Sequence, residues 1–168
     1  KYIDVWKLRV KPSPKRHTYH ALTRIEFSNL MKHLESDDIV FSMIALLMVE
    51  TGLRISAVLR LRISELKGYF RKIGSGSDVN SVIQIPYLDK ASEDTIKYCD
   101  LPIRTILRLQ KEYLSRIYIK RKVLHETKSE NTSIVYNKDA LWLLSNGREV
   151  NYSDVSKSFQ KASNKMGF

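Results

Sequence analysis

One arginine stands where its type and position suit a definite chemistry. Arg54 directly follows residues 50–53 (ETGL), in which an apolar run ends on a glycine. A glycine there suits the left-handed conformation that closes a helix, and a second apolar-periodic segment, residues 55–61, starts at once after the arginine. We therefore expect Arg54 at a corner between two packed helices, where its planar, permanently charged group suits a phosphate.

The same position has a second explanation. Cations are common near helix C-termini because they complement the helix dipole and its free carbonyl groups. The spacing of residues 50–56 alone does not separate this structural role from phosphate binding. The remainder of the sequence has to decide between them.

Other residue types that carry chemistry give weaker signals. His17 and His20 are three residues apart, but no third ligand accompanies them, so we expect no metal site. His33 and His125 fall on predicted helices as surface or boundary residues. Cys99 is the single cysteine, which excludes an internal disulfide and a cysteine-based zinc cluster. Packing in strands, helices or turns explains the tyrosines that we considered, which are Tyr87, Tyr113, Tyr118, Tyr136 and Tyr152.

The composition is that of a basic globular domain. The 168 residues include 29 Lys and Arg against 18 Asp and Glu, a net charge of +11, and 43% of them are hydrophobic. This is enough for one domain with a substantial core. The positive charge indicates a polyanionic partner, with nucleic acid first and an anionic membrane surface second. A lipid surface would call for an amphipathic helix studded with Trp or Phe, which the sequence lacks.

Membrane insertion and secretion are not expected. The longest apolar run, Ile39–Val49, is far shorter than the roughly 18 residues that a spanning helix needs. The start of the chain has no signal peptide, although it opens on Lys1 rather than on Met, as an excised piece would. We expect a reducing, cytoplasmic setting.

Basic residues gather in two stretches. Residues 1–20 carry six cations against the single acid Asp4, and two prolines keep this stretch extended. It is interpreted as a basic linker along a phosphate backbone or, equally, as a solvated terminus. The second stretch is residues 111–128. The candidates for contact with DNA in the two stretches are Lys11, Lys15, Arg16, Lys120, Arg121 and Lys122.

Helix signals organise the first half of the chain. Thr23 and Glu26 have the spacing of a capping box and predict a helix through Leu34. Ser36 and Asp37 offer caps to the next helix, whose apolar residues lie nearly all round it and predict a buried central position. Residues 68–81 are turn-rich, and no Lys-Ser or Lys-Thr pair follows their glycines as in a phosphate-binding loop.

The second half begins with a predicted hairpin. Strands at Val82–Leu88 and Thr95–Leu101 flank the polar residues 89–94. Pro102 suits the first position of a longer helix. The inner face of that helix should carry Ile103, Ile106, Leu107, Tyr113, Leu114 and Ile117.

Shorter elements complete the chain. Residues 126–132 are polar and predict a loop, and Ala140–Leu144 predicts a short strand. Residues 146–147 (NG) are a turn signal, and Ser153 is a predicted cap for a final helix. The expected fold class is mainly α with a small antiparallel β-sheet (α+β), with the domain over residues 21–168 after the linker of residues 1–20.

In this order, the elements resemble the catalytic domain of the tyrosine recombinases, the phage-type integrases of mobile genetic elements. Residues 51–56 (TGLRIS), continued through Leu59, Leu61 and residues 64–66 (SEL), are similar to the first arginine motif of that family. The hairpin that ends in residues 99–103 (CDLPI) resembles the one that carries the catalytic lysine. Residues 143–168 resemble the segment before the second motif, so the resemblance covers nearly the whole chain.

The resemblance implies DNA strand cleavage and rejoining through a phosphotyrosyl intermediate, without a metal or other cofactor. It implies that Arg54 stabilises the phosphate charge in the transition state and that a hairpin lysine protonates the departing sugar oxygen. Lys90 at the end of the first strand is the first choice for this acid, and Lys97 is its rival because it lies nearer to Pro102. Without the resemblance, a hairpin lysine is ordinarily a solvated edge residue.

The chain departs from the family pattern in two respects. Ala57 stands where an acidic residue usually follows the arginine by three positions. The later His-x-x-Arg, the following His or Trp and the nucleophilic tyrosine are missing from the 168 residues. We therefore expect a truncated domain that binds double-stranded DNA as a monomer and does not cleave it alone.

The resemblance sets further expectations for the parent protein, which should form a tetramer on DNA at the nucleoid of a bacterial cell. The alternative is a noncatalytic DNA-binding or regulatory protein with the same scaffold, since a fold alone does not fix a function.

Overall fold

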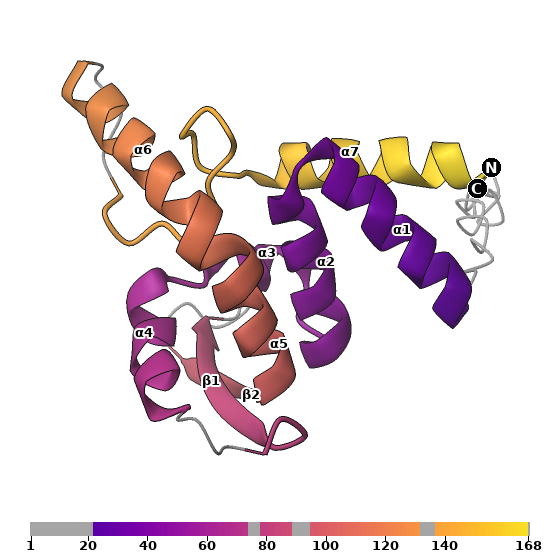
Figure 1. Ribbon diagram of the computed structural model, residues 1–168, viewed down its shortest axis with the longest axis horizontal. Helices are drawn as coiled ribbons and strands as arrows, with labels where there is room; N and C mark the ends of the chain where they lie inside the picture. The colour runs from indigo at the N-terminus through magenta and orange to yellow at the C-terminus, as the bar shows by residue number, and fades with distance from the viewer. Residues whose placement is uncertain (1–21, 74–77, 89–94, 132–136, 168) are drawn as a thin grey trace, which may run out of the picture.

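The computed structural model describes residues 22–73, 78–88, 95–131 and 137–167. It is mainly helical with a two-stranded antiparallel sheet, so the expected α+β class is confirmed. The linker expected over residues 1–20 lies outside the described residues. Figure 1 shows the hairpin at one end of the molecule, with α1 and α7 crossing side by side at the other.

The first two helices meet at a tight corner. α1 (Arg24–Asp37) begins at Thr23, whose hydroxyl accepts the Glu26 N–H, while the Glu26 carboxylate accepts the Thr23 N–H at 2.7 Å. This confirms the predicted capping box. α2 (Ile39–Thr51) is capped by Asp38, whose carboxylate accepts the Val40 N–H at 3.0 Å. The predicted caps Ser36 and Asp37 are therefore wrong by one or two residues.

The predicted central position of α2 is confirmed. Residues 40–47 are all buried, and Ile44 and Val40 have no exposed surface. Two short helices follow, α3 (Ile55–Arg60) and α4 (Ile63–Lys72). The turn-rich reading of residues 68–81 is thus wrong for residues 68–72, which continue α4.

The hairpin pairs β1 (Val82–Leu88) with β2 (Ile96–Pro102), which confirms the two predicted strands to within one residue. Ile85 lies opposite Cys99 and is fully buried. Pro102 closes β2 and precedes the next helix, so it stands just outside the predicted first helical position. Tyr69 of α4 donates a 2.7 Å hydrogen bond to the Gln84 carbonyl and holds the hairpin against α4.

One long rod follows the hairpin. It consists of α5 (Ile103–Arg108), the π-helix η1 (Leu109–Tyr118) and α6 (Ile119–Asn131), and Figure 1 shows it rising from β2 past the rest of the molecule. Within η1, the Ser115 hydroxyl donates to the Gln110 carbonyl, five residues earlier, at 2.8 Å. The loop predicted over residues 126–132 is wrong as far as Asn131, because α6 continues through them.

The last part of the chain closes the core. Residues 140–144 make only isolated bridges, Arg62 with Ala140 and Leu143 with Glu149, and are not the strand that was predicted. The predicted turn is confirmed, since Gly147 has φ +81°. α7 (Tyr152–Met166) begins at Asn151, whose side chain accepts the Asp154 N–H, so the predicted cap Ser153 is wrong.

Candidate nucleic-acid interface at the Arg54 corner

The corner between α2 and α3 is fixed by short-range hydrogen bonds. Gly52 closes α2 with φ +70°, and its N–H donates to the Met48 carbonyl at 2.9 Å. The Thr51 hydroxyl donates to the Leu47 carbonyl at 2.6 Å and accepts the Leu53 N–H at 3.2 Å. The left-handed glycine predicted from the sequence is confirmed.

Arg54 has an anchored main chain and an exposed side chain. It is the N-terminal cap residue of α3, and its carbonyl accepts the N–H groups of Ala57 at 2.9 Å and Val58 at 3.1 Å. Its guanidinium is exposed and forms no ion pair or hydrogen bond with any other described residue. An arginine in this state has all its donors available for an anion.

Ala57, which is buried, stands where the tyrosine recombinases that this sequence resembles usually have an acid. Its side chain is 6% exposed and packs into the core beside Val58. It supplies no carboxylate near Arg54, and the corner is instead held by Thr51 and Gly52. The departure from the family pattern thus leaves the bend intact while leaving the Arg54 guanidinium free of a neighbouring acid at this position.

An ion pair connects the base of the hairpin with the Arg54 corner. Arg104 in α5 donates to both carboxylate oxygens of Glu50, at 3.1 and 3.3 Å. Glu50 lies in the last turn of α2, one turn before Arg54. The helix that leaves the hairpin is therefore tied to the motif that carries the arginine.

Of the two hairpin lysines, Lys97 lies within the described residues. Lys97 lies on β2 opposite Tyr87, and its side chain is exposed. Lys90 falls outside the described residues, as do Lys11, Lys15 and Arg16 of the linker. Their predicted contacts with DNA stay predictions.

The three basic residues at the start of α6 differ in burial and in the partners of their side chains. Lys120 is exposed, and Lys122 is half-buried with its ammonium 3.9 Å from Glu126. Arg121 is buried, donating at 2.8 Å to Asp38 and at 2.7 Å to the Leu143 carbonyl. We therefore withdraw Arg121 from the DNA-binding set and assign it a structural role.

The sequence held a signal for the burial of Arg121. Leu114, Tyr118, Arg121 and His125 recur at intervals of four, three and four residues, which places them on one face of the rod. All four are buried. A cation on this buried face needs an acidic partner from another element, because an unpaired buried charge is unfavourable. Here the partner is Asp38 at the start of α2.

The other candidate side chains are structural. Tyr113 and Tyr118 are buried and donate to backbone carbonyls of Leu141 and Ala140 at 3.1 and 2.8 Å, as the packing interpretation predicted. Burial raises the pKa of the Tyr113 phenol far above its ordinary value. His125 is buried, with Nδ1 2.8 Å from the Gly147 carbonyl, so its prediction as a surface or boundary residue is wrong.

The described part of the chain offers neither a metal site nor a membrane-spanning helix. It contains no group of three His, Cys, Asp or Glu side chains arranged to hold a metal ion. None of its helices combines the length and the apolar character needed to cross a bilayer.

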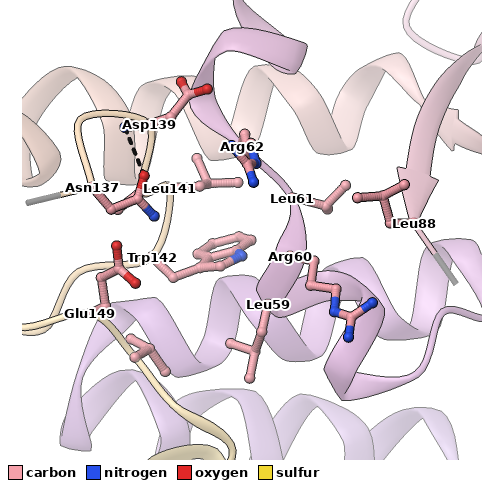
Figure 2. A pocket seen from close by; sticks show the side chains of 12 residues that line it. Leu59, Arg60, Leu61, Arg62, Leu88, Asn137, Asp139, Leu141, Trp142 and Glu149 are labelled. Atoms are coloured by element: carbon pink, nitrogen blue, oxygen red, sulfur yellow. Dashed lines mark hydrogen bonds between the residues drawn. The ribbon is translucent and has the colours of Figure 1, made fainter. Parts of the chain in front are cut away.

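A polar cavity of about 370 Å³ lies beyond the other end of α3 (Figure 2). The segment between α3 and α4 forms one side of it, and the segment after α6 forms the other. Sequence reasoning missed this cavity because its walls come from parts of the chain far apart in sequence. The residues that line it are Leu59, Arg60, Leu61, Arg62, Leu88, Asn137, Asp139, Ala140, Leu141, Trp142, Glu149 and Val150.

The Ser64 and Asp139 side chains join these two walls. The Asp139 carboxylate accepts the Ser64 N–H at 3.1 Å and the Ser64 hydroxyl at 2.6 Å, and so caps the first turn of α4. The hydrogen bond from the Ser64 hydroxyl holds the pKa of Asp139 below its ordinary value. The cavity is thus bounded by elements that are fixed to each other.

Taken together, the arrangement offers an exposed arginine at a rigid bend, a hairpin tied to that bend and a polar cavity at the far end of α3. Comparison with protein-family models, with curated proteins and with solved structures finds no match to this chain. The likeness to the tyrosine recombinases consists of the sequence motifs alone.

Proposed function

We propose that this chain is a DNA-binding part of the catalytic domain of a site-specific tyrosine recombinase. The observation that carries the proposal is the exposed Arg54 guanidinium on a backbone that is fixed on both sides. The net charge of +11 supports a polyanionic partner. A phosphodiester fits because its two nonbridging oxygens match the fork of a guanidinium.

In the proposed reaction a tyrosine of the recombinase outside these 168 residues loses its proton to water, and its oxygen attacks the phosphorus. A P–O bond to tyrosine forms, and the bond to one sugar oxygen breaks. Arg54 binds the nonbridging oxygens, whose charge grows in the transition state. A hairpin lysine, Lys90 or Lys97, gives its proton to the departing sugar oxygen. The hydroxyl of a second strand later displaces the tyrosine and restores the phosphodiester.

The 168 residues contain no His-x-x-Arg sequence. The buried tyrosines Tyr113 and Tyr118 donate their hydroxyl groups to backbone carbonyls. We therefore expect this chain alone to bind DNA without cleaving it. Incubation with a labelled duplex, followed by denaturing electrophoresis, should give no covalent adduct. A covalent adduct would contradict this part of the proposal.

DNA affinity is tested by fluorescence anisotropy with a labelled duplex over a series of salt concentrations. We expect a Kd on the order of 10⁻⁴ to 10⁻⁶ M at physiological salt, and a steep weakening as salt rises. Affinity that does not depend on salt, or no binding at low salt, would contradict the proposal.

The role of Arg54 is tested in the same assay with Arg54→Ala and Arg54→Lys. Losing one phosphate contact should reduce the slope of log K against log salt by about 0.9 for Arg54→Ala. The lysine variant should restore most of the slope, since it keeps the charge but not the two-pronged geometry. The matched control is Arg116→Ala, another exposed arginine, on η1. Equal effects of Arg54→Ala and Arg116→Ala would remove Arg54 from the interface.

The alternative function is a noncatalytic DNA-binding protein with the same scaffold, and it predicts the same salt-dependent affinity. The sequence of the reading frame around these residues separates the two candidates. A downstream His-x-x-Arg followed by a tyrosine supports the recombinase. A frame without these motifs supports the noncatalytic protein.

A further inference from the structure

The cavity beside α3 contains a buried acceptor that lacks a donor. The Glu149 Oε1 atom is cut off from solvent and accepts no hydrogen bond from any described residue. A buried carboxylate oxygen is unfavourable unless something donates to it. The other carboxylate of the cavity, Asp139, is already engaged with Ser64 through both of its oxygens. Glu149 lines the cavity, so a rotation of its side chain toward the cavity would present this unmatched oxygen to a ligand.

Two cations face the same cavity from the opposite wall. Arg60 and Arg62 line it and are exposed, and neither forms an ion pair with a described residue, although the charge of Arg62 helps to lower the pKa of Asp139. Figure 2 shows Glu149 and Arg60 on either side of the Trp142 ring. The cavity thus has an acceptor at one side and guanidinium groups at the other.

The side chain of Asn137 adds a donor on the acceptor side. Its Oδ1 accepts the Asp139 N–H at 3.2 Å, as the dashed line in Figure 2 shows. In this orientation its amide nitrogen is left to donate to a carbonyl oxygen of a ligand. A fitting ligand therefore has an anion at one end, and N–H donors next to a carbonyl at the other.

We propose that this cavity binds a single unstacked guanine nucleotide of DNA. Its phosphate would lie between Arg60 and Arg62, and its base would donate N1–H and N2–H to the Glu149 carboxylate. Among the four bases, guanine alone presents two adjacent N–H donors beside a carbonyl on its Watson–Crick edge, which an unstacked base exposes. The cavity of about 370 Å³ lies in the range of small-ligand sites.

The identification of DNA as the source of the nucleotide rests on the proposed function, but the binding of the nucleotide itself does not. Arg54 and Arg60 stand at opposite ends of α3, so one strand could run from the corner to the cavity. Along a strand, the axial rise is about 3.4 Å per nucleotide. The distance between Cα atoms six residues apart in a helix, about 9 Å, therefore corresponds to roughly three nucleotides.

The first test uses free 5′-mononucleotides and the full chain. Trp142 lines the cavity, and its indole N–H signal in a proton–nitrogen NMR spectrum can be assigned with Trp6→Phe, because the chain has two tryptophans. Deoxyguanosine monophosphate should shift this signal at lower concentration than the adenine, cytosine and thymine nucleotides. If inorganic phosphate shifted the signal at the same concentration, the cavity would bind anions without recognising guanine, and the proposal would be wrong. The absence of a shift with any nucleotide would also overturn it.

The second test uses variants of the two walls. Glu149→Gln should weaken guanine nucleotide binding roughly tenfold and remove the preference over adenine, because the two-pronged acceptor is lost. The double variant Arg60→Ala, Arg62→Ala should weaken all four nucleotides alike. Arg116→Ala, outside the cavity, should change nothing. A retained preference in Glu149→Gln would contradict the role of Glu149.

Folding of the variants and the link to DNA are checked separately. Without ligand, Glu149→Gln should fold and melt near the wild-type temperature, since the two side chains have nearly the same shape and Oε1 accepts no hydrogen bond that the variant would lose. Duplexes with one bulged guanine should bind more tightly than duplexes with one bulged thymine. If the chain does not bind a plain duplex but binds the free guanine nucleotide, the proposed DNA-binding function is contradicted and the nucleotide site is supported. If the chain binds a plain duplex but shows no preference for the bulged guanine, the inference that the cavity binds a guanine of DNA is contradicted and the proposed function is not.

Discussion

The indole N–H of Trp142 donates a 2.7 Å hydrogen bond to the carbonyl of Val58, 84 residues earlier in the chain. Val58 lies in α3, directly after the corner that carries Arg54. Trp142 also stacks near Tyr113, with ring centroids 6.0 Å apart. A single buried ring thus joins the arginine motif, the π-helix and the wall of the cavity.

Replacing this ring should weaken the whole domain. Trp142→Phe leaves the Val58 carbonyl without its donor and removes buried apolar surface, so we expect a loss of about 2–4 kcal/mol in the free energy of unfolding. Urea denaturation followed by circular dichroism at the helix band measures it. A change of less than about 0.5 kcal/mol, the size of an ordinary surface substitution, would show that the hydrogen bond contributes little.

Adjacent basic residues on α6 should differ in their effects. Arg121→Ala leaves the Asp38 carboxylate buried and without its ion-pair partner, and we expect it to cost about 3–5 kcal/mol of stability. Lys120→Ala should stay within about 0.5 kcal/mol of wild type, because its side chain is exposed. Thermal and urea unfolding of the two variants make the comparison, and equal losses would contradict the structural role of Arg121.

Three glycines should respond differently to alanine. Gly68→Ala, inside α4 with open space around it, should stabilise by about 0.5–1 kcal/mol. Gly52→Ala should destabilise by about 1 kcal/mol, because φ is +70° although nothing lies near the new methyl group.

Gly147→Ala should destabilise most of the three, because a Cβ at this position would lie 2.8 Å from the His125 backbone nitrogen and φ is +81°. Urea unfolding gives the order of the series. Similar values for Gly52→Ala and Gly147→Ala would show that the backbone around His125 moves aside.

Acid should destabilise the protein through three carboxylates. Hydrogen bonds from Lys161, Ser64 and Arg148 hold the pKa values of Asp37, Asp139 and Asp154, respectively, below the ordinary value. Groups with a lowered pKa stabilise the folded state above the unfolded pKa, about 3.9, and this contribution is lost as pH falls through the folded value. The free energy of unfolding should therefore decline below about pH 4.

The Asp139 contribution can be isolated with Asp139→Asn. The variant has no carboxylate to protonate at this position, so its stability should decline less steeply below about pH 4 than that of wild type. Urea midpoints over a pH series measure the two slopes. Parallel slopes would show that Asp139 plays no part in the acid response.

Arg54 should matter for DNA and not for folding. Its guanidinium is exposed and forms no hydrogen bond or ion pair with a described residue, so Arg54→Ala should change the free energy of unfolding by less than about 0.5 kcal/mol. The same variant should lower DNA affinity, as proposed above. A large loss of stability would mean that the side chain has a packing role, and its effect on DNA would then be indirect.

Local signals in the sequence predicted much of the fold. The capping box at Thr23, the left-handed Gly52 and the hairpin strands each depend on a few neighbouring residues, and all three are confirmed. The buried position of α2 followed from its apolar surface on all sides. In each case the residues that set the conformation are adjacent to those that adopt it.

Long-range contacts account for what the sequence did not predict. Asp38 caps α2 while it binds Arg121, and the distant Leu143 carbonyl completes the site of that arginine. The polar residues 126–131 remain helical as the end of a rod that is anchored at its other end. The cavity wall around Glu149 likewise forms only when residues 137–150 reach α3.

The π-helix sets the length of the rod as well as its shape. Its wider turns hold more residues for each revolution than an α-helix does, so they fix the rotation between the hairpin end of the rod and its far end. If the wide turns persisted after the deletion of one residue between Leu109 and Tyr118, α6 would rotate about the rod axis by roughly a quarter of a turn. Arg121 and His125 would then swing away from Asp38 and Gly147, so relatives of this chain should conserve the number of residues in this segment more strictly than their identity.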